Sequence, residues 1–176
     1  MDNKFLQEYN IPFVGMKHSL HKFEYFIDGT FFSNFEESSI ENCQIEVKLD
    51  FDKKENFFLL NFYIDGFVKL ACDRCSEDFD QEIFGDFEVA VKFGDGSEAE
   101  DLDEDVVYIS KSDDFINVAK LIYDFIILSI PLRCVHPNDK DGNSTCNQDV
   151  LAKLNNKENT EVDPRWAALE KLKNKK

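Results

Sequence analysis

The sequence predicts an α+β domain: a mainly antiparallel β-sheet, barrel-like or sandwich-like, covered by one long helix, with a short helix at the C-terminus. Extended segments rich in Phe, Ile, Val and Tyr fill the first half of the chain, and one run of apolar residues at helical spacing follows them. A hydrophobic content of 43%, with 18 Phe in 176 residues, is ample for one packed core. We expect this single domain to cover residues 1–154.

Strands are expected in the segments 22–27, 43–50, 56–64 and 82–93. In the second of these, Ile45, Val47 and Leu49 alternate with polar residues, which is the pattern of a half-buried strand. Asp65 and Gly66 stand between two apolar runs, and this dipeptide favours a hairpin turn that would pair 57–64 with 67–71. The pair Cys72 and Cys75 then lies in a connection between two strands.

The covering helix is expected to begin near Ser112, where a serine and two aspartates offer an N-cap, and to stop at Pro131. Apolar residues recur between them at helical spacing: Phe115, Val118, Ala119, Ile122, Phe125 and Ile126. A second, short helix is expected over 148–154. The segment 121–132 is the most apolar of the chain, but it is too short for a membrane span and contains Asp124.

Residues 155–176 are expected to form a polar linker and a basic helical tail. Asp163 suits an N-cap and Pro164 the first helical position. The tail from residue 163 onward has five basic and two acidic residues, against a net charge of −16 for the whole chain. The residues that we expect to bind a partner are Asp163, Pro164, Arg165, Trp166, Leu169 and Leu172.

The net negative charge of the chain indicates which classes of molecule it can bind. A chain with 36 acidic and 20 basic residues repels phosphate backbones, so naked RNA is an unsuitable ligand except at the tail, and a basic protein is a better one. Residues 95–105 hold seven carboxylates, which favours a solvated acidic loop over a docking strip. An odd number of cysteines and no secretory signal favour a cytoplasmic protein.

The two cysteines of "CDRC" allow three interpretations. A zinc site would need two more ligands, which His136 and Cys146 can supply, or Cys134 in place of the histidine. A redox pair fits less well, because these cysteines follow a strand and precede acidic residues. The spacing favours a third interpretation, in which both cysteines are structural thiols on a tight turn between two strands. Zinc stays an open candidate cofactor.

Catalytic motifs are not found in the sequence. His18, His21 and His136 have no nucleophile elbow near them, and the chain has neither a glycine-rich phosphate loop nor an HExxH motif. We therefore expect a protein that is not an enzyme.

Three stretches carry a resemblance to a known family: "CDRC" within "VKLACDRCSEDF", the helix end "ILSIPLR" before "VHP", and the closing "DPRWAALEKL". With these stretches the sequence resembles the YceD family of bacterial large ribosomal RNA subunit accumulation proteins, from about Lys22 to Leu172. The chain departs from many members in one respect. Many family members share the first cysteine pair and also carry a second Cys-x-x-Cys in the later loop. In that loop this chain has only Cys134 and Cys146, with His136 between them.

The resemblance implies a non-catalytic role in ribosome biogenesis that supports accumulation of the large-subunit (23S) rRNA, through a ribosomal protein or a pre-ribosomal large-subunit particle. Two other functions remain open. One is a zinc-stabilised protein-interaction module, which is compatible with the first. The other is an rRNA-processing nuclease, against which the lack of a recognisable carboxylate motif for metal binding counts.

Overall fold

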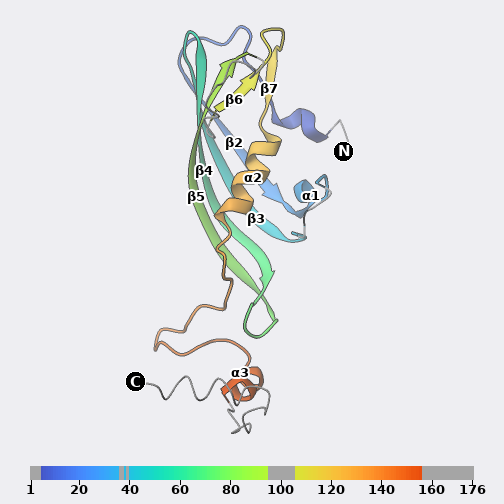
Figure 1. Cartoon of the computed structure of the whole chain (residues 1–176), viewed down its shortest axis with the longest axis vertical. Helices are drawn as coiled ribbons and strands as arrows, with labels where there is room; N and C mark the ends of the chain where they lie inside the picture. The colour runs from blue at the N-terminus through green and yellow to red at the C-terminus, as the bar shows by residue number, and fades with distance from the viewer. Residues whose placement is uncertain (1–4, 36–37, 39, 95–105, 156–176) are drawn as a thin grey trace, which may run out of the picture.

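The structure is a computed structural model, and it describes residues 5–35, 38, 40–94 and 106–155. This part of the chain forms two sheets with short helices, drawn out along one long axis (Figure 1). The expected acidic loop at 95–105, and the expected linker and tail beyond residue 155, lie outside the described residues.

The larger sheet has five strands in the order β2-β3-β4-β5-β6. Neighbouring strands run antiparallel, except that β5 and β6 are parallel. The strands are β2 (Leu20–Asp28), β3 (Cys43–Lys53), β4 (Phe57–Ala71), β5 (Asp78–Phe93) and β6 (Val106–Ile109). The pairing of β3 with β4 ends at Cys43 and Val68, so the tip of the β4–β5 hairpin projects past the end of β3 (Figure 1).

A smaller sheet pairs β1 (Asn10–Pro12) with β7 (Phe115–Asn117), and a 3-10 helix, η1 (Phe5–Tyr9), precedes it. The α-helices are α1 (Gly29–Phe32), α2 (Ala119–Ser129) and α3 (Gln148–Asn155). The amide of Val118 donates to the carbonyl of Tyr9 at 3.0 Å, which ties the N-terminal segment to the start of α2. No helix in the described ranges has the length and apolar character that a membrane span needs.

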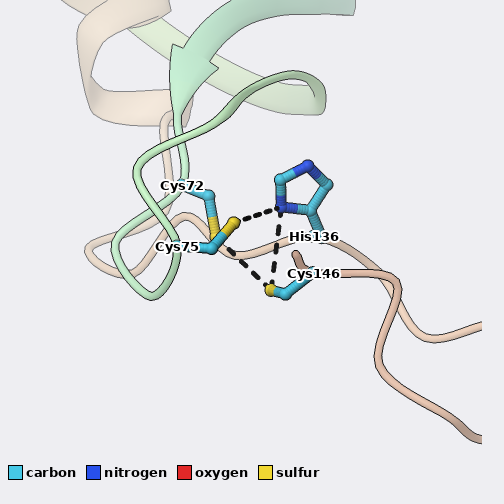
Figure 2. A group of neighbouring side chains, drawn as sticks. All are labelled: Cys72, Cys75, His136 and Cys146. Atoms are coloured by element: carbon cyan, nitrogen blue, oxygen red, sulfur yellow. Dashed lines mark hydrogen bonds between the residues drawn. The ribbon is translucent and has the colours of Figure 1, made fainter. Parts of the chain in front are cut away.

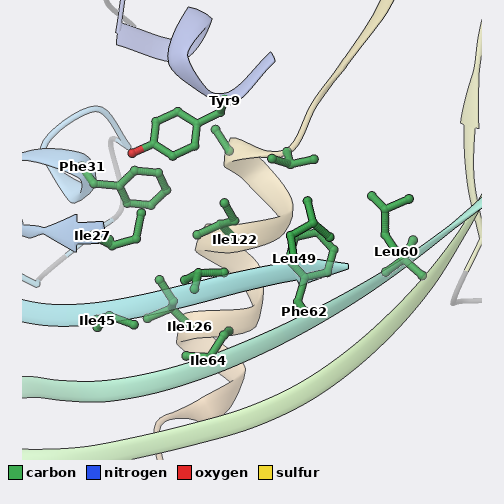
Figure 3. Close-up of a cluster of buried hydrophobic side chains, with 14 of the residues drawn as sticks. Tyr9, Ile27, Phe31, Ile45, Leu49, Leu60, Phe62, Ile64, Ile122 and Ile126 are labelled. Carbon is green, nitrogen blue, oxygen red and sulfur yellow. The ribbon is translucent and has the colours of Figure 1, made fainter. Parts of the chain in front are cut away.

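The core lies between one face of the larger sheet and the helix α2 (Figure 3). Every second residue of β3 points into it, from Cys43 to Phe51, as strand geometry requires. On α2, Ile122 and Ile126 are fully buried in the same cluster. The opposite face of the sheet carries the alternate, mostly polar side chains of β2 to β5.

The predicted fold class is wrong. The described residues form a mixed α+β fold with seven strands in two sheets, and only short helices accompany them. No single long helix covers the sheet, because α2 has 11 residues. The five strands of the larger sheet stand in an open row from β2 to β6 and do not form a barrel or a sandwich.

The helix was expected to begin near Ser112, and it begins seven residues later at Ala119. Residues Phe115 to Asn117 pair with β1 instead, so part of the apolar spacing belongs to a strand. The side chain of Asn117, the residue before the N-cap Val118, accepts a hydrogen bond from the amide of Ala119 at 3.0 Å and so satisfies the first amide of the helix. The expected stop at Pro131 is right: Ile130 is already extended, as the residue before a proline prefers to be.

The expected hairpin turn at Asp65 and Gly66 is also wrong, because β4 runs through both residues. Gly66 pairs with Ile45 of β3, and a Cβ built on Gly66 would lie 2.7 Å from the Cα of Ile45. The glycine therefore permits a close approach of two strands and does not form a turn. Residues 67–71 instead pair with β5, in a hairpin that closes through Cys72 to Glu77.

Candidate metal centre

The connection between β4 and β5 forms a tight turn that presents two thiols. The amide of Cys72 donates to the carbonyl of Glu77 at 2.9 Å, and the amide of Ser76 donates to the carbonyl of Cys72 at 2.8 Å. Ser76 adopts φ +61°, which lets the chain reverse within these few residues. The turn places Cys72 and Cys75 on the same side, and both are buried.

The loop after α2 returns to this turn and is held there by two hydrogen bonds. The amide of Cys134 donates to Asp73 Oδ2 at 2.7 Å, and the amide of Asp73 donates to the carbonyl of Cys134 at 2.8 Å. This reciprocal pair brings residues far apart in sequence together at the hairpin tip. His136, two residues further on, consequently faces the two cysteines.

A miniature hairpin closes the gap between His136 and Cys146. Asn138 and Ser144 form an antiparallel bridge, and the hydroxyl of Thr145 donates to the carbonyl of Pro137 at 2.6 Å. The Asp139 carboxylate accepts hydrogen bonds from the amides of Asp141 and Asn143 inside this loop. The nine intervening residues therefore fold back, and the two candidate ligands lie side by side at the base of the loop.

The four side chains Cys72, Cys75, His136 and Cys146 converge on one point (Figure 2). Their ligand atoms all lie within 4.8 Å of one another. The two sulfurs of Cys72 and Cys146 are 3.7 Å apart. His136 Nδ1 lies 3.4 Å from the sulfur of Cys75 and 3.7 Å from that of Cys146.

The three separations of 3.4 to 3.7 Å are close to those between the ligands of a tetrahedral zinc ion. Zinc–sulfur bonds of about 2.3 Å place two sulfurs about 3.8 Å apart, and a sulfur and an imidazole nitrogen roughly 3.6 Å apart. Three thiols and one imidazole are also a donor set that suits zinc. A zinc ion held by these residues would connect the hairpin tip to the loop after α2 and would supply folding free energy to both.

The thiols show why a cation is suited to this place. Burial raises the pKa of Cys72, but several hydrogen bonds to its sulfur outweigh burial and lower that pKa to about 5. The first of these donors is the backbone amide of Arg74, which lies 3.4 Å from the sulfur. The pKa of Cys75 is raised by burial and by the neighbouring thiols of Cys72 and Cys146. Without a positive ion, one thiolate in the cluster therefore opposes the ionisation of the next.

Cys134 does not join this group, although the sequence allowed it as an alternative to the histidine. Its thiol lies 3.3 Å from the carbonyl oxygen of Pro131, to which it can donate. Burial, followed by the nearby Asp73 and Cys72, raises its pKa. Cys134 helps to form the site only through its backbone, which is hydrogen-bonded to Asp73. The fourth residue of the candidate ligand set is therefore His136 and not Cys134.

The centre sits in a small apolar cluster of its own, apart from the main core. Cys72, Cys75 and Cys146 are its buried residues, and Phe79, Val135, Val150 and Leu151 pack against them. The ring of Phe79 lies 4.7 Å from that of His136 between centroids. Helix α3 is attached to the same cluster through Val150 and Leu151.

Asp73 and Asn147 are two residues of this region that sequence reasoning missed. Asn147 accepts from the amide of Asp149 at 2.9 Å, as an N-cap of α3, and its side-chain amide donates to Glu77 Oε1 at 2.6 Å. Its position directly before the expected helix at 148 is an N-cap signal. For Asp73, nothing in the sequence indicates its partner 61 residues away. The expected binding residues of the tail lie outside the described residues: Asp163, Pro164, Arg165, Trp166, Leu169 and Leu172.

Comparison with models of known protein families gives one finding. Residues 60–173 match the family described as "Large ribosomal RNA subunit accumulation protein YceD". The matched range contains all four residues of the candidate metal centre. No curated protein and no solved structure matches the chain.

Proposed function

The chain belongs to the YceD family of large ribosomal RNA subunit accumulation proteins, and on that premise we propose that it is a non-catalytic, cytoplasmic factor in ribosome biogenesis. In this role it supports accumulation of the large-subunit (23S) rRNA by binding a ribosomal protein or a pre-ribosomal large-subunit particle. The observation that carries the proposal is the family match, which extends from near the start of β4 through the candidate metal centre to residue 173.

The charge of the chain supports a protein contact over a contact with naked RNA. A net charge of −16 gives a negative field that repels phosphates and attracts basic proteins. Many proteins that bind rRNA directly are themselves basic for this reason, so an acidic factor is suited to hold one of them.

A second proposal concerns the metal centre, and it is compatible with the first. The converging thiols and imidazole support a zinc-stabilised interaction module made of the β4–β5 tip, the loop 131–147 and α3. The small apolar cluster has three buried residues, all of them cysteines, so hydrophobic burial alone stabilises this module weakly. In this proposal zinc has a structural role, since all four coordination positions are filled by the protein.

Co-purification from cells tests the first proposal. The full chain, isolated at low ionic strength from growing cells, should carry large-subunit ribosomal proteins or precursor 23S rRNA above the amounts found with an unrelated protein of similar negative charge. Recovery of neither, or equal recovery with the acidic control protein, would remove the support for a ribosomal partner.

A further inference from the structure

The face of the larger sheet opposite α2 is exposed and strongly acidic. All six outward positions of β5 from Asp78 to Glu88 are exposed, and five of them are carboxylates: Asp78, Asp80, Glu82, Asp86 and Glu88. No lysine or arginine of the described residues forms an ion pair with any of these five. The sixth position is Phe84, whose side chain is 81% exposed.

A second exposed aromatic residue stands across the same face. Phe26 of β2 is 78% exposed, and strand pairing places it in one row with Glu46, Asp65 and Phe84. Phe26 and Phe84 are therefore two large apolar side chains that the described part of the chain leaves uncovered on one acidic face.

A hollow of about 510 Å³ opens beside Phe26 on this face. Phe26 and Phe67 supply its aromatic walls, and Asp28, Glu46 and Asp65 supply carboxylates. Lys48 pairs with Glu46 at 3.0 Å, whereas Asp65 has no such partner among the described residues. The Asp28 carboxylate accepts from Thr30, and these hydrogen bonds lower its pKa and keep it anionic.

The hollow continues toward the acidic residues of β5. A larger hollow of about 840 Å³ shares Asp28, Gln44 and Phe67 with it and extends to Lys69 and Asp80. An extended chain could therefore pass from Phe26 over Phe67 to Asp80 without leaving the surface.

We propose that this face binds a basic polypeptide segment, with an arginine side chain inserted between Phe26 and Phe67. The aromatic rings accept the flat guanidinium by stacking, and the carboxylates of Asp28 and Asp65 neutralise it. The unpaired carboxylates of β5 then attract the basic residues that follow. This inference rests on the proposed function and specifies its partner as a basic protein.

The charge of the surface argues against other occupants. RNA would bring phosphates to a face with a row of unpaired carboxylates. A second copy of this chain would bring an identical acidic face, so its like charges would repel. A segment rich in arginine is complementary to both the charge and the aromatic walls.

Fluorescence anisotropy with purified full-length protein tests the proposal. The probe is a labelled peptide that alternates arginine with serine, and matched peptides carry lysine or glutamate in place of arginine. We expect the arginine peptide to bind more tightly than the lysine peptide, and the glutamate peptide not to bind. Phe26→Ser should weaken arginine-peptide binding about tenfold, as loss of a binding hot spot does, whereas Leu132→Ser, at a residue that is fully exposed away from this face, should not.

A charge-matched pair of variants keeps the test valid if Phe26→Ser fails to fold. Asp65→Asn with Glu82→Gln should weaken binding several-fold, while Glu55→Gln with Asp141→Asn removes the same charge elsewhere and should leave it nearly unchanged. Equal weakening by both pairs would show attraction by net charge alone and would overturn the proposal. Self-association that Phe26→Ser abolishes, or displacement of the peptide by single-stranded RNA, would also overturn it. Because no ribosomal particle is present, these outcomes are separate from those of the co-purification test.

Discussion

Single residues decide which thiols meet at the tip of the β4–β5 hairpin. Asp73 binds the backbone of Cys134 through both its amide and its carboxylate, so the loop after α2 enters the site at a defined position. The sulfur of Cys134 is thereby directed to Pro131, and His136 takes the place beside Cys75. Sequence spacing left both residues open as ligands, because the contact that separates them joins positions 61 residues apart.

Replacing Cys72 and Cys75 by serine tests the metal centre. If the four residues hold zinc, the wild type purified without added metal should contain about one equivalent, and the double variant almost none. The variant should also melt at a lower temperature, because structural zinc binding contributes to folding free energy. Metal analysis and thermal denaturation of both proteins measure this.

Cys134→Ser is the matched control, since it removes a buried thiol next to the site that is not in the ligand set. It should retain its zinc. A metal-free wild type that melts cooperatively would instead support the simple interpretation of structural thiols, and zinc loss from the Cys134 variant would point to a different ligand set.

At Gly66 the pairing of β3 with β4 should be highly sensitive to the addition of a single Cβ atom. Gly66→Ala introduces a Cβ 2.7 Å from the Cα of Ile45, and backbone atoms there must move. We expect a loss of roughly 2–4 kcal/mol in the free energy of unfolding, measured by denaturant titration.

Gly15→Ala provides the comparison for Gly66. Gly15 has φ +87°, but no atom lies within 4 Å of its added Cβ. Only backbone strain remains there, and the cost should be about 1 kcal/mol. Equal costs at the two positions would show that close strand approach is not the reason for glycine at 66.

Individual elements differ in how far their sequences predict them. The alternation of Ile45, Val47 and Leu49 identifies β3 because its pattern is local. The start of α2 and the role of Gly66 are not local: Phe115 to Asn117 become a strand through pairing with β1, and Gly66 faces a neighbouring strand. For the candidate metal centre, the Cys-x-x-Cys spacing and the cluster of Cys134, His136 and Cys146 in one loop supplied the candidates. The fold-back between His136 and Cys146 depends on contacts that spacing does not show.

The C-terminal tail is an element whose role is predicted from sequence alone. Trp166, Leu169 and Leu172 recur in the sequence at helical spacing, which predicts one apolar stripe on a segment too short to be a stable helix by itself. We predict that removing residues 163–176 leaves the melting temperature of the domain nearly unchanged but abolishes association with pre-ribosomal particles, measured by co-sedimentation.

A chain with the same tail residues in scrambled order is the control for charge and length. It should behave like the truncated chain, because the stripe is lost while the net charge is kept. Truncated protein that still co-sediments with the particles would contradict a binding role, and loss of cooperative melting would place Trp166 in the core.

The whole molecule combines two unequal centres of stability. The main core between the larger sheet and α2 contains many fully buried aromatic and aliphatic side chains, whereas the cluster at the hairpin tip has cysteines as its buried residues. One face of the sheet is covered by the core and the other is acidic and exposed. This arrangement suits the proposal of a protein that binds partners through its surface, in which a metal held by the four residues at the hairpin tip would keep the binding module in place.

The ratio of large-subunit to small-subunit rRNA in cells depleted of the protein tests the central claim most directly. If the chain supports accumulation of the large-subunit rRNA, depletion should lower mature 23S rRNA relative to the small-subunit species, and expression of the intact chain should restore the ratio. Equal ratios in depleted and undepleted cells, under both slow and fast growth, would contradict the account.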